Sequence, residues 1–189
     1  MVKIQNIVLI FSLLFTLNSF AENSIQVNIS EQRLYLLKFN EVLASYPISS
    51  SSYGEGQQEN SYKTPLGSHI IKEMIGSSAT KDTIFISRIN TKRAASLIKE
   101  PIDTDNDYVT SRIMWLEGEE EGFNKGGSVD SYQRYIYIHG TQEEGLIGSK
   151  ASHGCIRMFN NDVIDLYQRV NIGTCLLYTS PSPRDFEAS

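Results

Sequence analysis

The chain has 189 residues, which is enough for one domain with a substantial hydrophobic core. It carries 17 Lys and Arg against 22 Asp and Glu, a formal net charge of −5 at pH 7. A mildly acidic chain without a cluster of basic residues argues against the binding of nucleic acid.

The first 21 residues have the pattern of a signal peptide. Lys3 is followed by the mostly apolar run Ile7–Phe15, and Ser19 and Ala21 are the small residues that signal peptidase needs before its cleavage site. The apolar run is too short for a stable membrane span, although an uncleaved anchor is the alternative interpretation. We therefore expect cleavage after Ala21 and a secreted protein without a stable membrane span after processing.

Strand signals dominate the first half of the remaining chain. Ile25, Val27 and Ile29 alternate with polar residues, which is the period of a strand with one buried face. Asn40-Glu41 separates two further apolar runs and predicts a tight hairpin. The polar stretch Ser49–Lys63 lacks apolar periodicity and predicts a loop. The strand candidates are 25–29, 33–39, 42–48, 68–74, 83–89, 112–116 and 134–138.

Helix signals are few. Ala94–Ile98 is compatible with a short helix, and Asn161–Val170 predicts a longer one, with Asn160 or Asn161 as its N-cap. The stretch between the last two strand candidates holds five acids and four glycines and predicts a solvated loop. We therefore predict a mainly β domain with one or two helices and a β-sandwich or barrel-like architecture.

The C-terminal stretch Cys175–Asp185 raises a separate question. Its letters, CLLYTSPSPRD, are the translation of a DNA string that resembles a transposase adapter used to prepare sequencing libraries. The alternative is a native strand followed by a Ser/Pro tail. On the adapter interpretation the domain spans 22–174, residues 175–189 are a non-native tail, and Leu176–Tyr178 only mimic a native strand.

Cys155 is then the one native cysteine of a secreted protein. It has no partner for an intramolecular disulfide, and a free thiol in an oxidising compartment is a liability unless it has a role. The sequence SHGCIRM places it directly after His153-Gly154, and His139 lies 16 positions upstream, at the expected end of a strand. The intervening stretch TQEEGLIGSKAS contains two glycines and can fold back, so the two side chains can meet.

A neighbouring imidazole supplies the chemistry that a thiol needs. Because the thiolate is the nucleophile and a free cysteine is mostly protonated at neutral pH, a base must take its proton. The imidazole then returns that proton to a leaving amine, a step worth about 10²–10⁴-fold in rate. Gly154 leaves space beside the sulfur and lets backbone N–H groups face a developing oxyanion, worth about 3–4 kcal/mol per donor.

Two other interpretations of these residues stay open. A lone cysteine is by default a small buried hydrophobe. A zinc site from His139, His153 and Cys155 suits the ligand preference of zinc, but it lacks a CxxC or HExxH spacing and needs His69 or a carboxylate as fourth ligand. His69 has no motif around it, and we expect a surface or edge-strand residue there. We predict no metal and no other cofactor.

Residues 139–158, HGT(x)₁₀SHGCIRM, resemble the active-site signature of the L,D-transpeptidase catalytic domain family of the YkuD type. Upstream, IQVNISEQRLYLL resembles the family's first hairpin, TPLG its Thr-Pro-x-Gly turn, and residues 111–141 the approach used by many proteobacterial members. The resemblance covers roughly residues 25–174. Family members continue after Gly-Thr with a strand of alternating apolar residues, where this chain has the adapter-like sequence.

The resemblance implies acyl transfer on peptidoglycan stem peptides in the periplasm, a step in cell-wall synthesis and the maintenance of cell shape. The terminal D-Ala of a tetrapeptide stem would be released, and the side-chain amine of a second stem would accept the acyl group in a 3→3 cross-link. Water, a free D-amino acid and an outer-membrane lipoprotein are alternative acceptors. Carbapenems would acylate the same cysteine.

The resemblance also assigns roles to residues. Cys155 would be the acylated nucleophile and His139 the general base, its other ring nitrogen held by a backbone carbonyl near Gly140. His153 would shape the site, and the backbone amides of Gly154 and Cys155 would help to form the oxyanion hole.

Three further residues, Ser152, Arg157 and Tyr137, are candidates for substrate binding. Arg157 either anchors a substrate carboxylate or supports the loop through a buried ion pair, and Tyr137 either forms a cleft wall or packs in the core. A wall-binding module without turnover and a hydrolytic amidase remain competing functions. The presence of both a base and a thiol favours an enzyme over a binding module.

Overall fold

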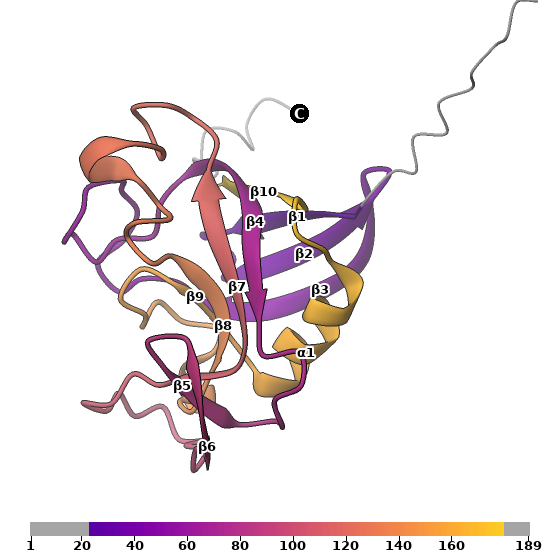
Figure 1. The fold of residues 1–189 in the computed structure, drawn as a ribbon, viewed down its shortest axis with the longest axis vertical. Helices are drawn as coiled ribbons and strands as arrows, with labels where there is room; N and C mark the ends of the chain where they lie inside the picture. The colour runs from indigo at the N-terminus through magenta and orange to yellow at the C-terminus, as the bar shows by residue number, and fades with distance from the viewer. Residues whose placement is uncertain (1–22, 180–189) are drawn as a thin grey trace, which may run out of the picture.

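The structure is a computed structural model and describes residues 23–179 (Figure 1). The predicted signal peptide and most of the predicted C-terminal tail lie outside this range. The described elements are β1 Ser24–Asn28, β2 Arg33–Lys38, β3 Glu41–Ser49, β4 Gly67–Ile75, β5 Thr83–Ile86, β6 Ile89–Ala94, β7 Val109–Gly118, β8 Tyr137–Thr141, β9 Ile156–Met158, α1 Asn160–Arg169 and β10 Cys175–Thr179, with short 3-10 turns at Gly127–Val129 and Glu144–Leu146.

The strands of the described residues form one ten-stranded sheet, in the order β4-β10-β1-β2-β3-β9-β8-β7-β5-β6. β4 also pairs with β7, so the sheet closes on itself, and the β5–β6 hairpin extends from the closed part (Figure 1). The prediction of a mainly β, barrel-like fold is confirmed. Within the described range, no helix is long and apolar enough to cross a membrane.

Alternation of apolar residues places one face of the first strands in the core. Ile25 and Val27 of β1 and Leu34 of β2 are 2% exposed or less. The β2–β3 turn consists of Phe39 and Asn40, both with positive φ, so it falls one residue before the predicted pair. Asn tolerates this backbone region better than most residues, which favours the tight turn.

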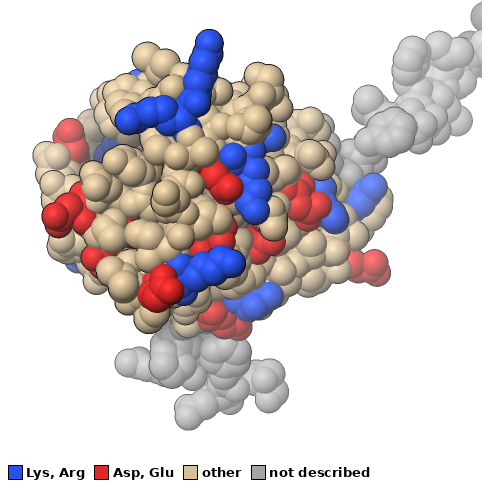
Figure 2. All heavy atoms as spheres, turned by 90° about the horizontal axis from the view of Figure 1, so that it is seen from below, with Lys and Arg blue, Asp and Glu red and all other residues tan. Residues whose placement is uncertain are grey.

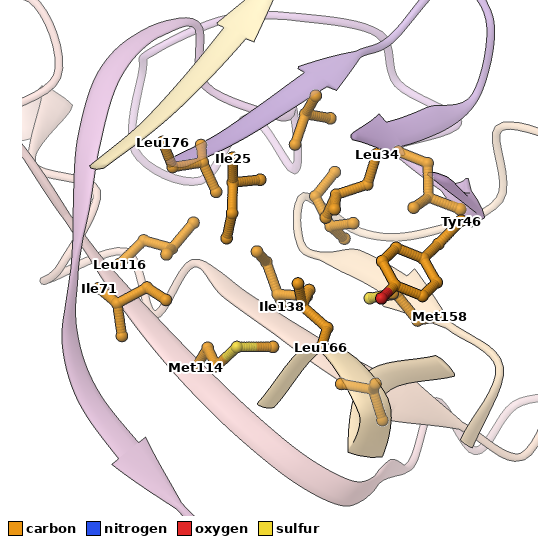
Figure 3. Packing of buried hydrophobic residues seen from close by; sticks show 14 of the residues in the cluster. Ile25, Leu34, Tyr46, Ile71, Met114, Leu116, Ile138, Met158, Leu166 and Leu176 are labelled. Carbon is orange, nitrogen blue, oxygen red and sulfur yellow. The ribbon is translucent and has the colours of Figure 1, made fainter. Parts of the chain in front are cut away.

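The main core lies inside the closed sheet, where side chains from distant segments converge (Figure 3). Helix α1 contributes Val163 and Leu166 to this core, Val170 just after its end adds to it, and the helix packs against β7 and β8. Because full burial of such a side chain is worth about 1.5–3 kcal/mol, the helix is held by its apolar face.

The prediction that Asn160 or Asn161 is the N-cap of α1 is wrong. The helix begins at Asn160, and the capping position is Phe159, which has no side-chain cap. Glu144 supplies the acceptor instead, because its Oε1 lies 2.9 Å from the Asn160 N–H. A carboxylate at this end also suits the helix dipole.

Three further predictions differ from the structure. Residues 83–89 form a hairpin rather than one strand, because Ser87 and Arg88 have φ values of 47° and 68° and reverse the chain between β5 and β6. No helix forms at Ala94–Ile98; β6 runs to Ala94, and the Ile98 N–H donates to the Gln142 carbonyl. Strand β8 starts at Tyr137, three residues later than predicted.

Residues 175–179 complete the sheet. Strand β10 pairs in parallel with β1 and antiparallel with β4, and Leu176 and Tyr178 are each 2% exposed. The sequence therefore fits this position through its alternation of apolar residues, as either a native strand or a mimic would. The non-native origin of this segment stays a prediction.

Candidate active site

Cys155 is positioned by the pairing of β9 with β8. The two strands are parallel, with Ile156 opposite Ile138, so the residue just before β9 lies beside the start of β8. The Tyr137 N–H donates to Cys155 Sγ at 3.3 Å, and the thiol donates to the Tyr135 carbonyl at 3.4 Å. The cysteine is half-buried rather than sealed in the core.

The turn before Cys155 is held by Ser152. Its Oγ donates to the Cys155 carbonyl at 2.6 Å and accepts from the Gly154 N–H at 3.3 Å. Ser152 is fully buried, so its hydroxyl fixes the turn and does not face a substrate; the substrate-binding prediction for Ser152 is wrong. Gly154 has φ +119°, a backbone conformation that L side chains rarely adopt, and this explains a glycine beside the cysteine.

His139 lies within β8 rather than at its end, and it is 2% exposed. Its Nδ1 lies 2.7 Å from the Gly140 carbonyl, the kind of acceptor that the resemblance implies. Because a carbonyl only accepts, Nδ1 carries the proton and Nε2 keeps its lone pair. A Cβ on Gly140 would lie 2.5 Å from Asn160 Oδ1, so only glycine fits there.

Cys155 and His139 line the same cleft, which has a volume of about 90 Å³. Its other walls are Asp107, Val109, Tyr137 and His153. The fold thus brings together two side chains 16 positions apart in an accessible hollow, as the sequence predicts.

Burial sets the charge state of this pair. It raises the pKa of the Cys155 thiol to about 12, although the Tyr137 N–H opposes the shift. Burial also lowers the pKa of His139, although the negative charge of Asp107 and the bond to Gly140 oppose this. The resting pair is therefore a neutral thiol beside a neutral imidazole, which is suited to general-base catalysis.

Asp107 is a site residue that the sequence reasoning missed. Its Oδ2 lies 2.6 Å from Arg157 Nη2 and 3.1 Å from His153 Nδ1. Burial works to raise its pKa, but the charge of Arg157 and the hydrogen bonds from Arg157 and His153 outweigh burial and hold the pKa below its usual range. Asp107 follows two other acids in a polar stretch, so no local pattern distinguishes it.

Arg157 is fully buried and bound by two acids. Nη1 lies 2.9 Å from Glu143 Oε2, and Nη2 contacts Asp107. The buried ion pair is thus the correct alternative, and the prediction that Arg157 anchors a substrate carboxylate is wrong. Its guanidinium supports the loop and β8 instead.

Tyr137 forms a wall of the cleft, as one of the two alternatives predicts. Its hydroxyl accepts a hydrogen bond from Arg88 Nη1 at 3.1 Å, and its ring meets Trp115 edge-on at 5.5 Å. Burial raises the pKa of Tyr137 to about 12, so the ring is a neutral surface.

His69 is buried, although the sequence predicts a surface or edge-strand residue. It is fully buried in β4, which pairs with β10 on one side and β7 on the other. Nδ1 donates to the Gly67 carbonyl at 3.1 Å and Nε2 lies 2.8 Å from Ser131 Oγ. The surface prediction is wrong because closure of the sheet removes the edge. Among residues 23–179, no group of three or more His, Cys, Asp or Glu is arranged to hold a metal ion.

The charged side chains around the molecule are mixed in sign. Figure 2 shows Lys and Arg interspersed with Asp and Glu on the face seen from below in Figure 1. That face therefore offers no extended surface of one charge to a polyanion.

The chain belongs to the L,D-transpeptidase catalytic domain family. The YkuD family model matches residues 22–177. YqjB of Bacillus subtilis, whose name places it in the same family, is 46% identical over 54 residues, which are 29% of this chain and 30% of YqjB. YbiS of Escherichia coli K12 is 44% identical over 41 residues, 22% of this chain and 13% of YbiS.

Three solved structures, two of them named as L,D-transpeptidases, share the fold. Bd1075 of Bdellovibrio bacteriovorus has a TM-score of 0.53 at 16% identity, over 88% of this chain and 52% of Bd1075. An L,D-transpeptidase from Mycobacterium smegmatis has a TM-score of 0.50 at 17% identity, over 85% of this chain and 59% of that protein. LdtMt1, solved in complex with imipenem, has a TM-score of 0.50 at 15% identity over 84% of this chain and 59% of LdtMt1. This chain thus spans less than two thirds of these relatives.

Proposed function

We propose that the protein is a periplasmic peptidoglycan L,D-transpeptidase with Cys155 as nucleophile and His139 as general base. The observation that carries the proposal is the shared cleft, in which His139 presents Nε2 because the Gly140 carbonyl holds Nδ1. An imidazole fixed in this tautomer can take the proton of a neutral thiol as the sulfur attacks.

In the acylation step, Sγ of Cys155 attacks the carbonyl carbon of the third stem residue while its proton moves to Nε2 of His139. We assign the stabilisation of the oxyanion to the backbone N–H of Cys155, because the N–H of Gly154, also expected there, donates to the buried Ser152 Oγ at 3.3 Å. Collapse of the intermediate breaks the bond to D-Ala, whose amine takes the proton from His139. A thioester on Cys155 remains.

In the second step, the side-chain amine of another stem attacks the thioester and gives a 3→3 cross-link. Water in its place gives carboxypeptidase activity, and a D-amino acid or a lipoprotein amine gives exchange or attachment. The thioester conserves the free energy of the broken peptide bond to D-Ala, so the reaction needs no ATP.

Carbapenems belong to the same proposal. LdtMt1 was solved in complex with imipenem. A strained β-lactam carbonyl that reaches the cleft of Cys155 meets the same nucleophile and base, so we expect imipenem to acylate Cys155.

The decisive experiment uses the mature protein, a tetrapeptide-bearing muropeptide and mass spectrometry. We expect loss of D-Ala, an acylated Cys155 and a cross-linked dimer. If the only product is the tripeptide monomer, the reaction is hydrolysis and not transfer. An unchanged substrate would favour a wall-binding module. Cys155→Ala is the control, and full activity in that variant would refute the nucleophile assignment.

Location is tested separately. Fusion of residues 1–21 to a reporter that folds only in the periplasm should give an active reporter and a product cleaved after Ala21. An inactive, uncleaved fusion would contradict the periplasmic part of the proposal.

A further inference from the structure

The cleft contains a second histidine whose partner is an acid. His153 Nδ1 lies 3.1 Å from Asp107 Oδ2. Because an ionised carboxylate only accepts, Nδ1 carries a proton, and in the neutral form of the ring Nε2 is the nitrogen with the lone pair. His139 has the same tautomer through the Gly140 carbonyl. The cleft therefore holds two imidazoles, each with one nitrogen able to take a proton.

The two histidines differ in what they face. The side chain of His153 is 44% exposed, whereas His139 is 2% exposed. His153 also lines a second cavity of about 280 Å³, and it is the one residue that lines both this cavity and the cleft of Cys155. An acceptor that occupies the larger cavity reaches the sulfur past His153.

The His153 ring is held in place from several sides. Tyr53 and Tyr62 of the loop after β3 each place their ring 5.9 Å from it. Arg134 fixes that loop by donating to the carbonyls of residues 56, 57 and 63 at 3.3, 2.8 and 2.6 Å. With Asp107 on Nδ1, the imidazole is oriented before any ligand arrives, as a catalytic group needs to be.

We propose that His153, oriented by Asp107, is the general base that takes the proton of the attacking amine in the transfer step. The inference rests on the proposed function and divides its two steps, with His139 serving the acylation of Cys155 and His153 the attack on the thioester. Asp107 is a positioning residue whose negative charge also stabilises the imidazolium that forms.

The acceptor arrives as an ammonium group and first loses one proton to solvent. As the neutral amine attacks, the nitrogen–carbon bond to the thioester carbonyl forms and a second proton moves from the nitrogen to Nε2 of His153. The carbon–sulfur bond then breaks, and the leaving thiolate of Cys155 takes a proton from solvent. His153 releases its proton to solvent, so the amide and the free thiol are the products.

The charges around His153 favour this role. Glu59 lies in the larger cavity and attracts an incoming ammonium group, while Arg134 in the same wall is occupied by backbone carbonyls. Asp107 also pairs with Nη2 of Arg157, and Nη1 of the same guanidinium pairs with Glu143. The remaining titratable groups that face the ring or share its cleft are His139, Cys155, Tyr137, Tyr53 and Tyr62.

The test separates the two steps by starting from the acyl-enzyme. The protein is acylated by a tetrapeptide stem, and the thioester is then offered either the amine of a second stem or hydroxylamine. Hydroxylamine is largely unprotonated at neutral pH and attacks thioesters without a base. For His153→Gln we expect transfer to the stem amine to fall by about 10²-fold, while capture by hydroxylamine changes by less than about threefold.

Asp107→Asn keeps an acceptor for Nδ1 and removes the charge. We expect a fall of about tenfold in transfer to the stem amine, again with little change in capture by hydroxylamine. Asp105→Asn, which removes an equal charge from an exposed position in the same loop, is the matched control and should behave as wild type. Only acylated protein is counted, so a misfolded fraction does not alter the ratio.

The outcomes separate this inference from the proposed function. Equal losses of rate with the stem amine and with hydroxylamine would mean that His153 has only a structural role. An unchanged rate of transfer to the stem amine would overturn its role as a base. If the wild-type protein forms no acyl-enzyme and releases no D-Ala, both proposals fail together.

Discussion

His69 and His139 are both buried histidines, and the contrast between them separates a structural imidazole from the one that we propose as a base. In each, Nδ1 donates to the carbonyl of a nearby glycine, Gly67 or Gly140. Burial lowers the pKa of both rings. The difference lies in the second nitrogen: Nε2 of His69 accepts from Ser131, whereas His139 lines the cleft with Cys155.

The comparison shows that burial and a fixed tautomer occur in a histidine that lies outside the cleft of Cys155 as well as in one that lines it. The ring of His69 is also enclosed by Tyr178, which meets it edge-on at 5.1 Å. An imidazole becomes a base only where its free lone pair meets a proton donor in an open space. The predictions that follow test this distinction, starting with the largest effect.

Replacement of each histidine by asparagine should separate the two roles most clearly. For His139→Asn we expect release of D-Ala from a tetrapeptide stem to fall by about 10²–10⁴-fold, because the thiol loses its proton acceptor. For His69→Asn we expect wild-type turnover per folded molecule. Rates are measured by mass spectrometry, with circular dichroism to count folded protein. A large loss of turnover in folded His69→Asn would break the comparison.

The first prediction extends to the pH profile of the same reaction, which shows whether His139 is required in its neutral form. Because only the neutral ring is a base, acylation should decline as the pH falls through the pKa of His139. Burial places that pKa below the ordinary value of about 6.5. Activity should therefore persist below pH 6.5, and a decline that begins well above it would contradict the assignment.

The second prediction concerns stability in acid. Burial lowers the pKa of His69 from 6.5 to about 4, so between these values the unfolded chain binds a proton that the folded chain does not. The contribution of His69 to the free energy of unfolding is complete above pH 6.5 and falls by about 3 kcal/mol as the pH drops to 4. Urea unfolding of wild type and His69→Gln at pH 7 and pH 4 measures it. An equal loss in both proteins would disprove the account.

Much of the fold was open to prediction because its signals are local. Alternation identifies β1 to β3, and one apolar face identifies α1, since both patterns depend on neighbours within a few residues. The reversal at Ser87 and Arg88 gave no such signal, because neither residue is a usual choice for positive φ. The same limit applies to the cap of α1, which comes from Glu144, outside the helix.

The candidate site divides in the same way. Cys155, His139 and the two glycines were found because their spacing is itself a motif. Asp107 was missed because its partners, Arg157 and His153, are about 50 residues away in the chain, so only the fold reveals the cluster. The burial of His69 depends on the β4–β7 pairing that closes the sheet, and no local pattern encodes that closure.

The third prediction extends the comparison to the thiol beside His139. Burial raises the pKa of Cys155 to about 12, so little thiolate is present at pH 8. We expect iodoacetamide to modify folded Cys155 at least about tenfold more slowly than the same residue in urea, where the pKa is near 8.5. The measurement uses Cys175→Ser to remove the exposed second thiol. A rate that levels off below pH 9 would instead indicate a stabilised thiolate and an ion-pair mechanism.

The smallest effect should come from Ser131→Ala, which removes only the partner of His69 Nε2. Ser131 is fully buried and its Oγ lies 2.8 Å from that nitrogen, so the substitution leaves a buried acceptor unsatisfied. We expect a loss of about 1–3 kcal/mol in the free energy of unfolding and wild-type release of D-Ala. Ser128→Ala, at an exposed position of the same loop, should change stability by less than about 0.5 kcal/mol. Equal stability in the two variants would mean that the bond to Ser131 does not hold His69. Slower turnover in Ser131→Ala would mean that the structural histidine and the catalytic one are coupled through β7, to which both β4 and β8 pair.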